Sequence, residues 1–166
     1  MTLVLLIGGA RSGKSRLALE RAEREGKPVS FIATGEAFDA EMTVRIERHK
    51  AERPDAWATI EEPVELERAL ASVPDGATAI VDCLSLWVAN VFELEPVEAL
   101  SAAAARAAAE RTGLTIAVTN EIGMGIVPDN ALARAYRDAL GRVNAQWAEA
   151  ADEAHFVVAG RTLTLS

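Results

Sequence analysis

The chain has 166 residues, of which 50% are hydrophobic and 25% charged, as is typical of one globular domain, here expected to span residues 1–166. Its formal net charge of −8 argues against a protein that holds nucleic acid through a basic face. The sequence contains no apolar run near the ~20 residues of a membrane span, and its one cysteine, Cys83, cannot form an internal disulfide. We therefore expect a cytoplasmic protein that neither spans a membrane nor binds nucleic acid.

Predicted strands and helices alternate along the chain. Strands are expected at residues 3–7, 29–33, 57–60, 79–82 and 114–119, and helices at 14–25, 39–52, 63–71, 84–92 and 98–113. Asp39 is the expected N-cap of the second helix, which Pro54 follows, and Gly113 occupies the position of a helix C′ glycine. This alternation predicts an α/β fold with a mainly parallel sheet and flanking helices.

The last third of the chain predicts a long helix and a hairpin. Apolar side chains at Leu132, Tyr136, Leu140, Val143 and Trp147 mark one helical face. The segment that begins at residue 155 predicts two antiparallel strands around Gly160.

Residues 8–15, "GGARSGKS", match the phosphate-loop pattern G-x-x-x-x-G-K-[ST]. The motif follows a predicted strand and opens a predicted helix, which is the context it needs. Its glycines let backbone amides turn towards a phosphate, and the helix N-terminus adds partial positive charge. Lys14 is expected to reach the β- and γ-phosphates and Ser15 to bind Mg²⁺. A glycine-rich turn without a ligand is the alternative.

Asp82 ends the apolar strand "TAIVD", where a P-loop enzyme needs a carboxylate to hold the Mg²⁺ shell. The pattern alone is weak, because many buried strands end in aspartate. The alternative is an N-cap for the following helix.

His49 continues the apolar stripe of Met42 and Ile46, so the predicted helix turns it towards the protein body. Arg45, one turn earlier, gives it a basic neighbour that favours the neutral imidazole. Spacing alone leaves a structural histidine and a nucleophile both open. His155, in the apolar run that leads into the last strand, is expected to be structural.

The loop of residues 119–130, "TNEIGMGIVPDN", follows a predicted strand at the edge where α/β proteins bind ligands. Glu121 could bind or activate a substrate hydroxyl. The alternative is a loop that packs on the sheet through Met124, Ile126 and Val127.

Four segments together closely resemble one enzyme family. These are the phosphate loop, residues 31–63 around "RIERHK", residues 81–90 ("VDCLSLWVAN") and residues 118–160 around "NEIGMGIVPDN". In this order and over nearly the whole chain they are similar to the bifunctional adenosylcobinamide kinase / adenosylcobinamide-phosphate guanylyltransferase of cobalamin biosynthesis.

The resemblance implies two reactions and a fold. Adenosylcobinamide would be phosphorylated with ATP or GTP, and GMP would then pass from GTP to that phosphate through a GMP–histidine intermediate on His49. The resemblance further implies a RecA-like P-loop fold and a homotrimer.

The resemblance also implies a set of site residues. The catalytic residues would be His49 and Lys14, and the metal ligands Ser15 and Asp82, the latter a glutamate in some members. Arg45 or Arg53 would neutralise charge. The nucleotide contacts would be Gly8, Gly9, Ala10, Arg11, Ser12, Gly13, Lys14, Ser15, Thr34, Gly35, Glu36, Lys50, Ala51, Glu52, Arg53, Glu62 (or Glu61) and Asp82. Two rival functions are a P-loop kinase for another metabolite and a non-catalytic nucleotide-binding module.

Overall fold

The computed structural model describes residues 2–36, 43, 44, 47, 50, 51, 53–94 and 96–165. Its sheet has seven strands in the order β3-β2-β4-β5-β1-β6-β7, and all neighbours are parallel except β6 and β7. The strands are β1 (Thr2–Gly8), β2 (Val29–Ala33), β3 (Ala58–Glu61), β4 (Thr78–Asp82), β5 (Leu114–Asn120), β6 (Glu153–Val158) and β7 (Arg161–Leu165). The helices are α1 (Lys14–Glu25), α3 (Leu66–Ser72), α4 (Leu84–Val91), α5 (Val97–Glu110) and α6 (Ala131–Ala150).

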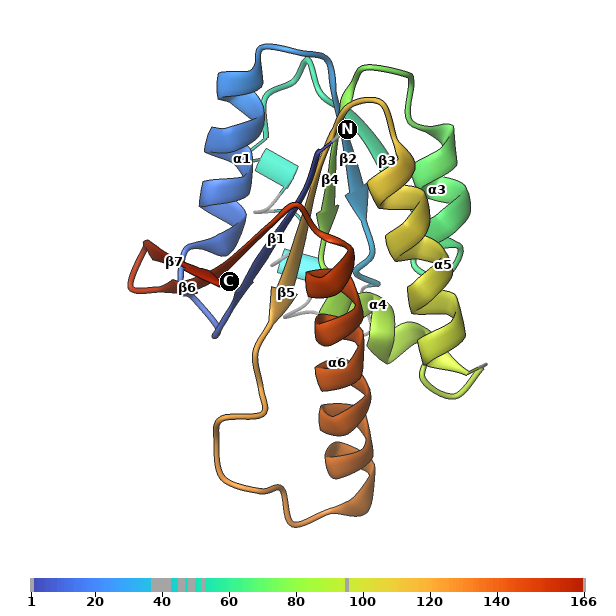
Figure 1. Ribbon diagram of the computed structural model, residues 1–166, viewed down its shortest axis with the longest axis vertical. Helices are drawn as coiled ribbons and strands as arrows, with labels where there is room; N and C mark the ends of the chain where they lie inside the picture. Colours follow the sequence, from blue (N-terminus) through green and yellow to red (C-terminus); the bar gives the residue numbers. More distant parts are fainter. Residues whose placement is uncertain are drawn as a thin grey trace.

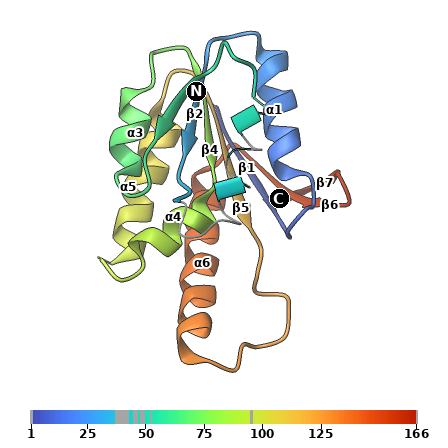
Figure 2. The ribbon, with the colours of Figure 1, turned by 180° about the vertical axis from the view of Figure 1, so that it is seen from behind.

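Helices cover both faces of the sheet. Helix α1 lies on one face, and α3, α5 and α6 lie on the other (Figures 1 and 2). Successive side chains of β1 face the two helix layers in turn, because side chains alternate along a strand. Leu3 and Leu5 pack in the cluster of α3–α6, whereas Val4 and Leu6 pack with α1. A strand buried on both sides explains the unbroken apolar run "LVLLI".

The predicted end of α5 is wrong. The helix stops at Glu110, and Arg111 follows in an extended conformation, so Gly113 is not its C′ residue. A Cβ at Gly113 would lie 2.1 Å from the carbonyl oxygen of Ala77. The glycine therefore allows a close approach of two chain segments and does not terminate the helix.

Two other helix predictions need correction. Helix α3 begins at Leu66 rather than Pro63, with Glu65 as its N-cap, and the Glu62 carboxylate accepts the amides of Val64 and Glu65 just before it. In α6, Leu140, Val143 and Trp147 are buried as expected, but Leu132 is 61% exposed. The first turns of α6 extend beyond the sheet, as Figure 1 shows.

The predicted helix of residues 39–52 falls mostly on residues outside the described part of the chain. Thr43, Val44, Glu47, Lys50 and Ala51 are helical, whereas Asp39 and His49 lie outside the described residues. Within the described ranges, no helix combines the length and the apolar character needed to cross a membrane.

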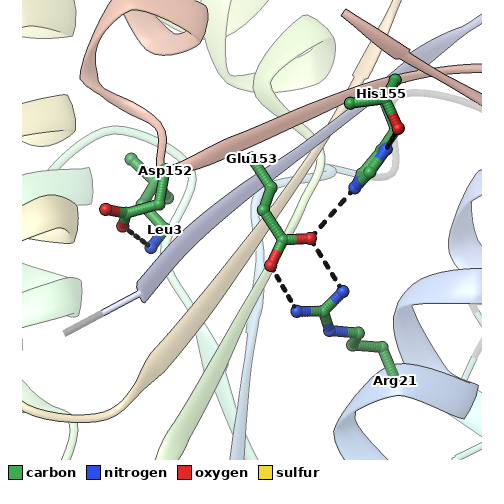
Figure 3. Close-up of polar contacts among 6 residues, drawn as sticks. Leu3, Arg21, Asp152, Glu153 and His155 are labelled. Atoms are coloured by element: carbon green, nitrogen blue, oxygen red, sulfur yellow. Dashed lines mark hydrogen bonds and ion pairs between the residues drawn. The ribbon is translucent and has the colours of Figure 1, made fainter.

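Polar contacts join β6 to α1 and β1 (Figure 3). Arg21 of α1 donates two hydrogen bonds, of 3.0 and 2.8 Å, to the Glu153 carboxylate, and His155 Nε2 lies 3.1 Å from Glu153 Oε2. Just before the strand, the Leu3 amide donates to Asp152 Oδ2 at 2.8 Å. These contacts agree with the structural role expected of His155.

Candidate nucleotide-binding site

Residues 8–15 form the connection between β1 and α1, as the phosphate-loop motif requires. Gly13 is the N-cap of α1 with φ of 102°, a conformation that costs an L-residue energy but suits glycine. A Cβ at Gly8 would lie 2.2 Å from the Val157 carbonyl oxygen and 2.9 Å from Ser12 Oγ. Both glycines are therefore required by the geometry of the loop and its neighbour β6.

Lys14 is only 7% exposed, and its Nζ donates a 2.7 Å hydrogen bond to the Gly9 carbonyl oxygen. A buried ammonium group needs such polar partners. The positive charge is thus held inside the loop, where a phosphate would meet it. Ser15 follows in the first turn of α1 and is half-buried.

The turn between β6 and β7 lies against the phosphate loop. Gly160 donates its amide to the Ser12 carbonyl oxygen at 2.8 Å, and a Cβ at Gly13 would lie 3.2 Å from Gly160 Cα. Ala159 and Gly160 both have positive φ, 52° and 72°, as a two-residue type I′ hairpin turn needs. The sequence predicts the hairpin but not this contact.

Asp82 ends β4 on the same edge of the sheet as the phosphate loop. It is half-buried, and Cys83, not Asp82, is the N-cap of α4. Burial and then the Asp82 charge raise the pKa of the Cys83 thiol to about 11, while a hydrogen bond with Ser85 and the Lys14 charge oppose this shift. Asp82 and Lys14 therefore both lie within electrostatic reach of one buried group.

Thr34 follows β2 and is fully buried. Its Oγ1 donates to the Cys83 carbonyl oxygen at 2.7 Å and accepts from the Cys83 amide at 2.9 Å. Asn90 of α4 donates to the Thr34 carbonyl oxygen at 2.7 Å. Thr34 thus fixes the end of β2 to the β4–α4 connection, and the chain then reaches the surface through Gly35 and Glu36.

The residues after position 49 also lie on this edge. Lys50 forms an ion pair with Glu61 at the end of β3, and Arg53 stacks its guanidinium 3.6 Å from the ring centroid of Phe31. Burial lowers the pKa of Arg53, against the opposing charges of Asp82 and Glu61. Arg53 therefore adds a half-buried positive charge near the strand-end acid.

Three of the expected site residues, Arg45, His49 and Glu52, lie outside the described residues. Ala51 is helical and exposed. Glu62 is described, and one of its oxygens accepts the amides of Val64 and Glu65 at 3.2 and 2.9 Å. Its expected nucleotide contact stays a prediction.

Magnesium fits the donor atoms of this edge. Within the described ranges, no cluster of three or more histidine, cysteine or acidic side chains could hold a metal by itself. Mg²⁺ characteristically binds through one or two protein groups together with substrate phosphates and water. The Ser15 hydroxyl and the Asp82 carboxylate are suitable hard oxygen donors for that arrangement.

A polar network at the end of β5 was not predicted from the sequence. Thr119 Oγ1 donates to Asn144 Oδ1 at 2.7 Å, and Asn144 Nδ2 donates to the Asn120 carbonyl oxygen at 3.0 Å. Asn120 Nδ2 in turn donates to Ser85 Oγ at 3.1 Å. The signal in the sequence is the change from apolar to polar residues at Thr119 and Asn120.

Comparison with solved structures shows the fold. The RadB recombinase superposes with a TM-score of 0.55 at 16% identity, over 93% of this chain and 73% of that chain. The flagellar accessory protein FlaH from Methanocaldococcus jannaschii gives 0.53 at 14% identity, over 97% and 74%. The predicted α/β P-loop fold of RecA type is confirmed.

Comparison with known sequences identifies the family. The family described as cobinamide kinase / cobinamide phosphate guanyltransferase matches residues 4–165. The bifunctional adenosylcobalamin biosynthesis protein CobP of Pseudomonas aeruginosa is 42% identical, over 97% of this chain and 95% of that protein. CobU of Salmonella typhimurium, with the same description, is 40% identical over 95% and 96%. The chain therefore belongs to the cobinamide kinase / cobinamide phosphate guanyltransferase family.

Proposed function

We propose that this protein phosphorylates adenosylcobinamide with ATP or GTP and then transfers GMP from GTP to the new phosphate. The product is adenosylcobinamide-GDP, an intermediate of cobalamin biosynthesis. One observation carries the proposal: in a chain of this family, the phosphate loop with its buried Lys14 shares an edge of the sheet with Asp82, Lys50 and Arg53.

In the phosphoryl transfer, the amides of residues 8–15 and Lys14 hold the β- and γ-phosphates. Ser15 and Asp82 would hold Mg²⁺, which would neutralise phosphate charge. Arg53 adds positive charge near Asp82. Catalysis here consists of positioning and charge stabilisation, as in other phosphoryl transfers.

In the guanylyl transfer, a neutral ring nitrogen of His49 attacks the α-phosphorus of GTP, and the bond to pyrophosphate breaks. The acceptor phosphate then displaces the histidine, which restores the free imidazole. One difficult transfer is divided into two easier displacements. The ion pair of Lys50 with Glu61 supports this role, because it fixes the residue next to His49 at the end of β3.

The remaining nucleotide contacts are proposed at Thr34, Gly35, Glu36, Lys50, Ala51, Glu52, Arg53 and Glu62. We further propose a magnesium-dependent homotrimer of the cytoplasm. Exposed apolar side chains on the β5–α6 loop support self-association. The buried free thiol of Cys83 is compatible with a reducing compartment.

The covalent step is tested by incubating the protein with Mg²⁺ and GTP labelled at the α-phosphate, followed by denaturation. The wild type is expected to retain an acid-labile, base-stable label, and His49→Ala to retain none. His155→Ala is the matched control, because it removes the other histidine of the sequence, and it should still carry label.

An unlabelled wild type would contradict the guanylyl transfer and leave the rival of a simple P-loop kinase, which needs Lys14 but not His49. Label on His49→Ala would contradict the assignment of the nucleophile. Nucleotide binding without turnover of any corrinoid acceptor would indicate the non-catalytic module.

A further inference from the structure

We propose that Glu121 is the catalytic base of the phosphoryl transfer and accepts the proton of the hydroxyl that attacks the γ-phosphate. The inference rests on the proposed kinase activity and assigns it a residue separate from the guanylyl-transfer histidine. Of the two interpretations of the β5–α6 loop, it favours a catalytic role for Glu121 over a loop that only packs on the sheet.

Glu121 is the first residue after β5 and lies directly beside the phosphate loop. Its amide donates a 3.1 Å hydrogen bond to the carbonyl oxygen of Gly8, the first glycine of the motif. Gly8 is also the register partner of Asn120. Because β5 lies between β1 and β4, Glu121 follows the strand that separates the phosphate loop from Asp82.

The backbone that carries Glu121 is held firmly. Asn144 of α6 binds both the Thr119 hydroxyl and the Asn120 carbonyl oxygen, and the Asn120 side chain binds Ser85. Contacts on three sides therefore fix the end of β5 against β1, α4 and α6. A catalytic group needs such support to be held at a productive distance.

The side chain itself keeps basic capacity. Glu121 is half-buried, and its Oε1 accepts the amide of Gly123 in the same loop. In the part of the chain that the structure describes, its Oε2 has no hydrogen-bond partner. One oxygen thus orients the carboxylate while the other can accept a proton.

Other carboxylates on this edge are less suited. Glu61 is paired with Lys50, and Glu62 binds the amides before α3. Glu36 follows β2, three strand spacings from β1, or roughly 14 Å at about 4.8 Å each. Asp82 has the proposed metal role. Glu121 is the acid whose backbone contacts the phosphate loop.

The step balances without a further reactant. The acceptor hydroxyl oxygen forms a bond to the γ-phosphorus, and the bond from that phosphorus to the β–γ bridging oxygen breaks. The nucleoside diphosphate leaves with the bond electrons. The hydroxyl proton passes to the Glu121 carboxylate and is then released to water.

Glu121→Gln tests the inference, because glutamine keeps the size and the hydrogen bond to Gly123 but is a far weaker base. The kinase kcat should fall by about 10²- to 10⁴-fold, the range typical of a lost general base. ATP affinity and the amount of label from α-labelled GTP should stay within about threefold of the wild type. The thermal midpoint should stay within about 2 °C. The acid limb of the kinase pH–rate profile should disappear.

Asp129→Asn is the matched control, because it removes an exposed carboxylate of the same loop, and it should leave both activities unchanged. A Glu121→Gln kinase rate within threefold of the wild type would overturn the inference. So would a parallel loss of both activities, since that indicates a structural role. Failure of the proposed function is recognised separately, because the wild type would then lack kinase activity.

Discussion

Arg21 and Glu153 form a bidentate pair between α1 and the start of β6, where Glu153 is level with Val4 of β1. The hydrogen bonds from Arg21, and then that from His155, lower the pKa of Glu153 from 4.5 to about 2. A lowered folded-state pKa means that the pair stabilises the native state above pH 4.5 and that this contribution is lost as the pH falls towards 2. The Glu153 side chain is 37% exposed, so solvent screening limits the effect to about 1 kcal/mol or less.

Removal of the Glu153 carboxylate should change the stability of the protein in acid. Glu153→Gln should lower the unfolding free energy near pH 7 and should flatten its decline between pH 4.5 and pH 2. Glu20→Gln is the control, because Glu20 pairs with Arg16 along an exposed helix surface. Denaturant titrations at several pH values measure both; identical pH slopes for the two variants would refute the assignment.

Single residues also show what local patterns can predict. Lys14, Ser15 and Asp82 are recognisable because a short motif and its position after a strand determine their surroundings. The contacts of Glu62 with the amides before α3, and of Gly113 with Ala77, are not recognisable in this way. They depend on backbone paths and on packing between segments, which no local pattern specifies.

At the scale of elements, the β6–β7 hairpin supports the phosphate loop. In its turn, the Gly160 amide donates a hydrogen bond to the Ser12 carbonyl oxygen. Its first strand pairs with β1 and lies against Gly8. The loop is therefore held by an element far away in the sequence. The sequence predicts both elements, because the motif and the turn glycine are local. It does not predict their contact, which follows from the strand order.

Replacing Gly160 by alanine should distinguish the effect of the hairpin on ATP binding from its effect on folding stability. Gly160 and Gly76 have nearly the same φ, 72° and 74°, so each alanine variant should cost roughly 1–2 kcal/mol of folding stability. Only Gly160→Ala should also weaken ATP binding, by about three- to tenfold. Calorimetric titration with thermal melts measures both; equal affinities in the two variants would show that the hairpin does not position the loop.

At the scale of the whole molecule, the first turns of α6 and the preceding loop extend beyond the sheet (Figure 1). Met124, Ile126, Val127 and Leu132 are all exposed there, and Ile126 is 98% exposed. The sequence contains these apolar residues but does not predict their exposure. The length of a helix predicted from sequence does not indicate how much of that helix the sheet covers. Such a surface is typical of a contact between molecules.

We expect the proposed trimer to bury this surface. Ile126→Glu should shift the sedimenting species towards the monomer at micromolar concentration, because it places a charge in an apolar contact. Leu163→Glu, which changes an exposed leucine of β7, should leave the mass unchanged. A trimer that persists in Ile126→Glu, or one that only Leu163→Glu dissociates, would place the contact elsewhere.

The pairing of β1 with β6 has a consequence for biosynthesis of the protein. During translation, β1 emerges early, but its second neighbour and the turn that braces its glycines emerge only with residues 153–161. At about 5–20 residues per second, the nascent phosphate loop waits on the order of 10 s for this partner. The new chain should therefore bind nucleotide more weakly until the hairpin has left the ribosome and paired with β1.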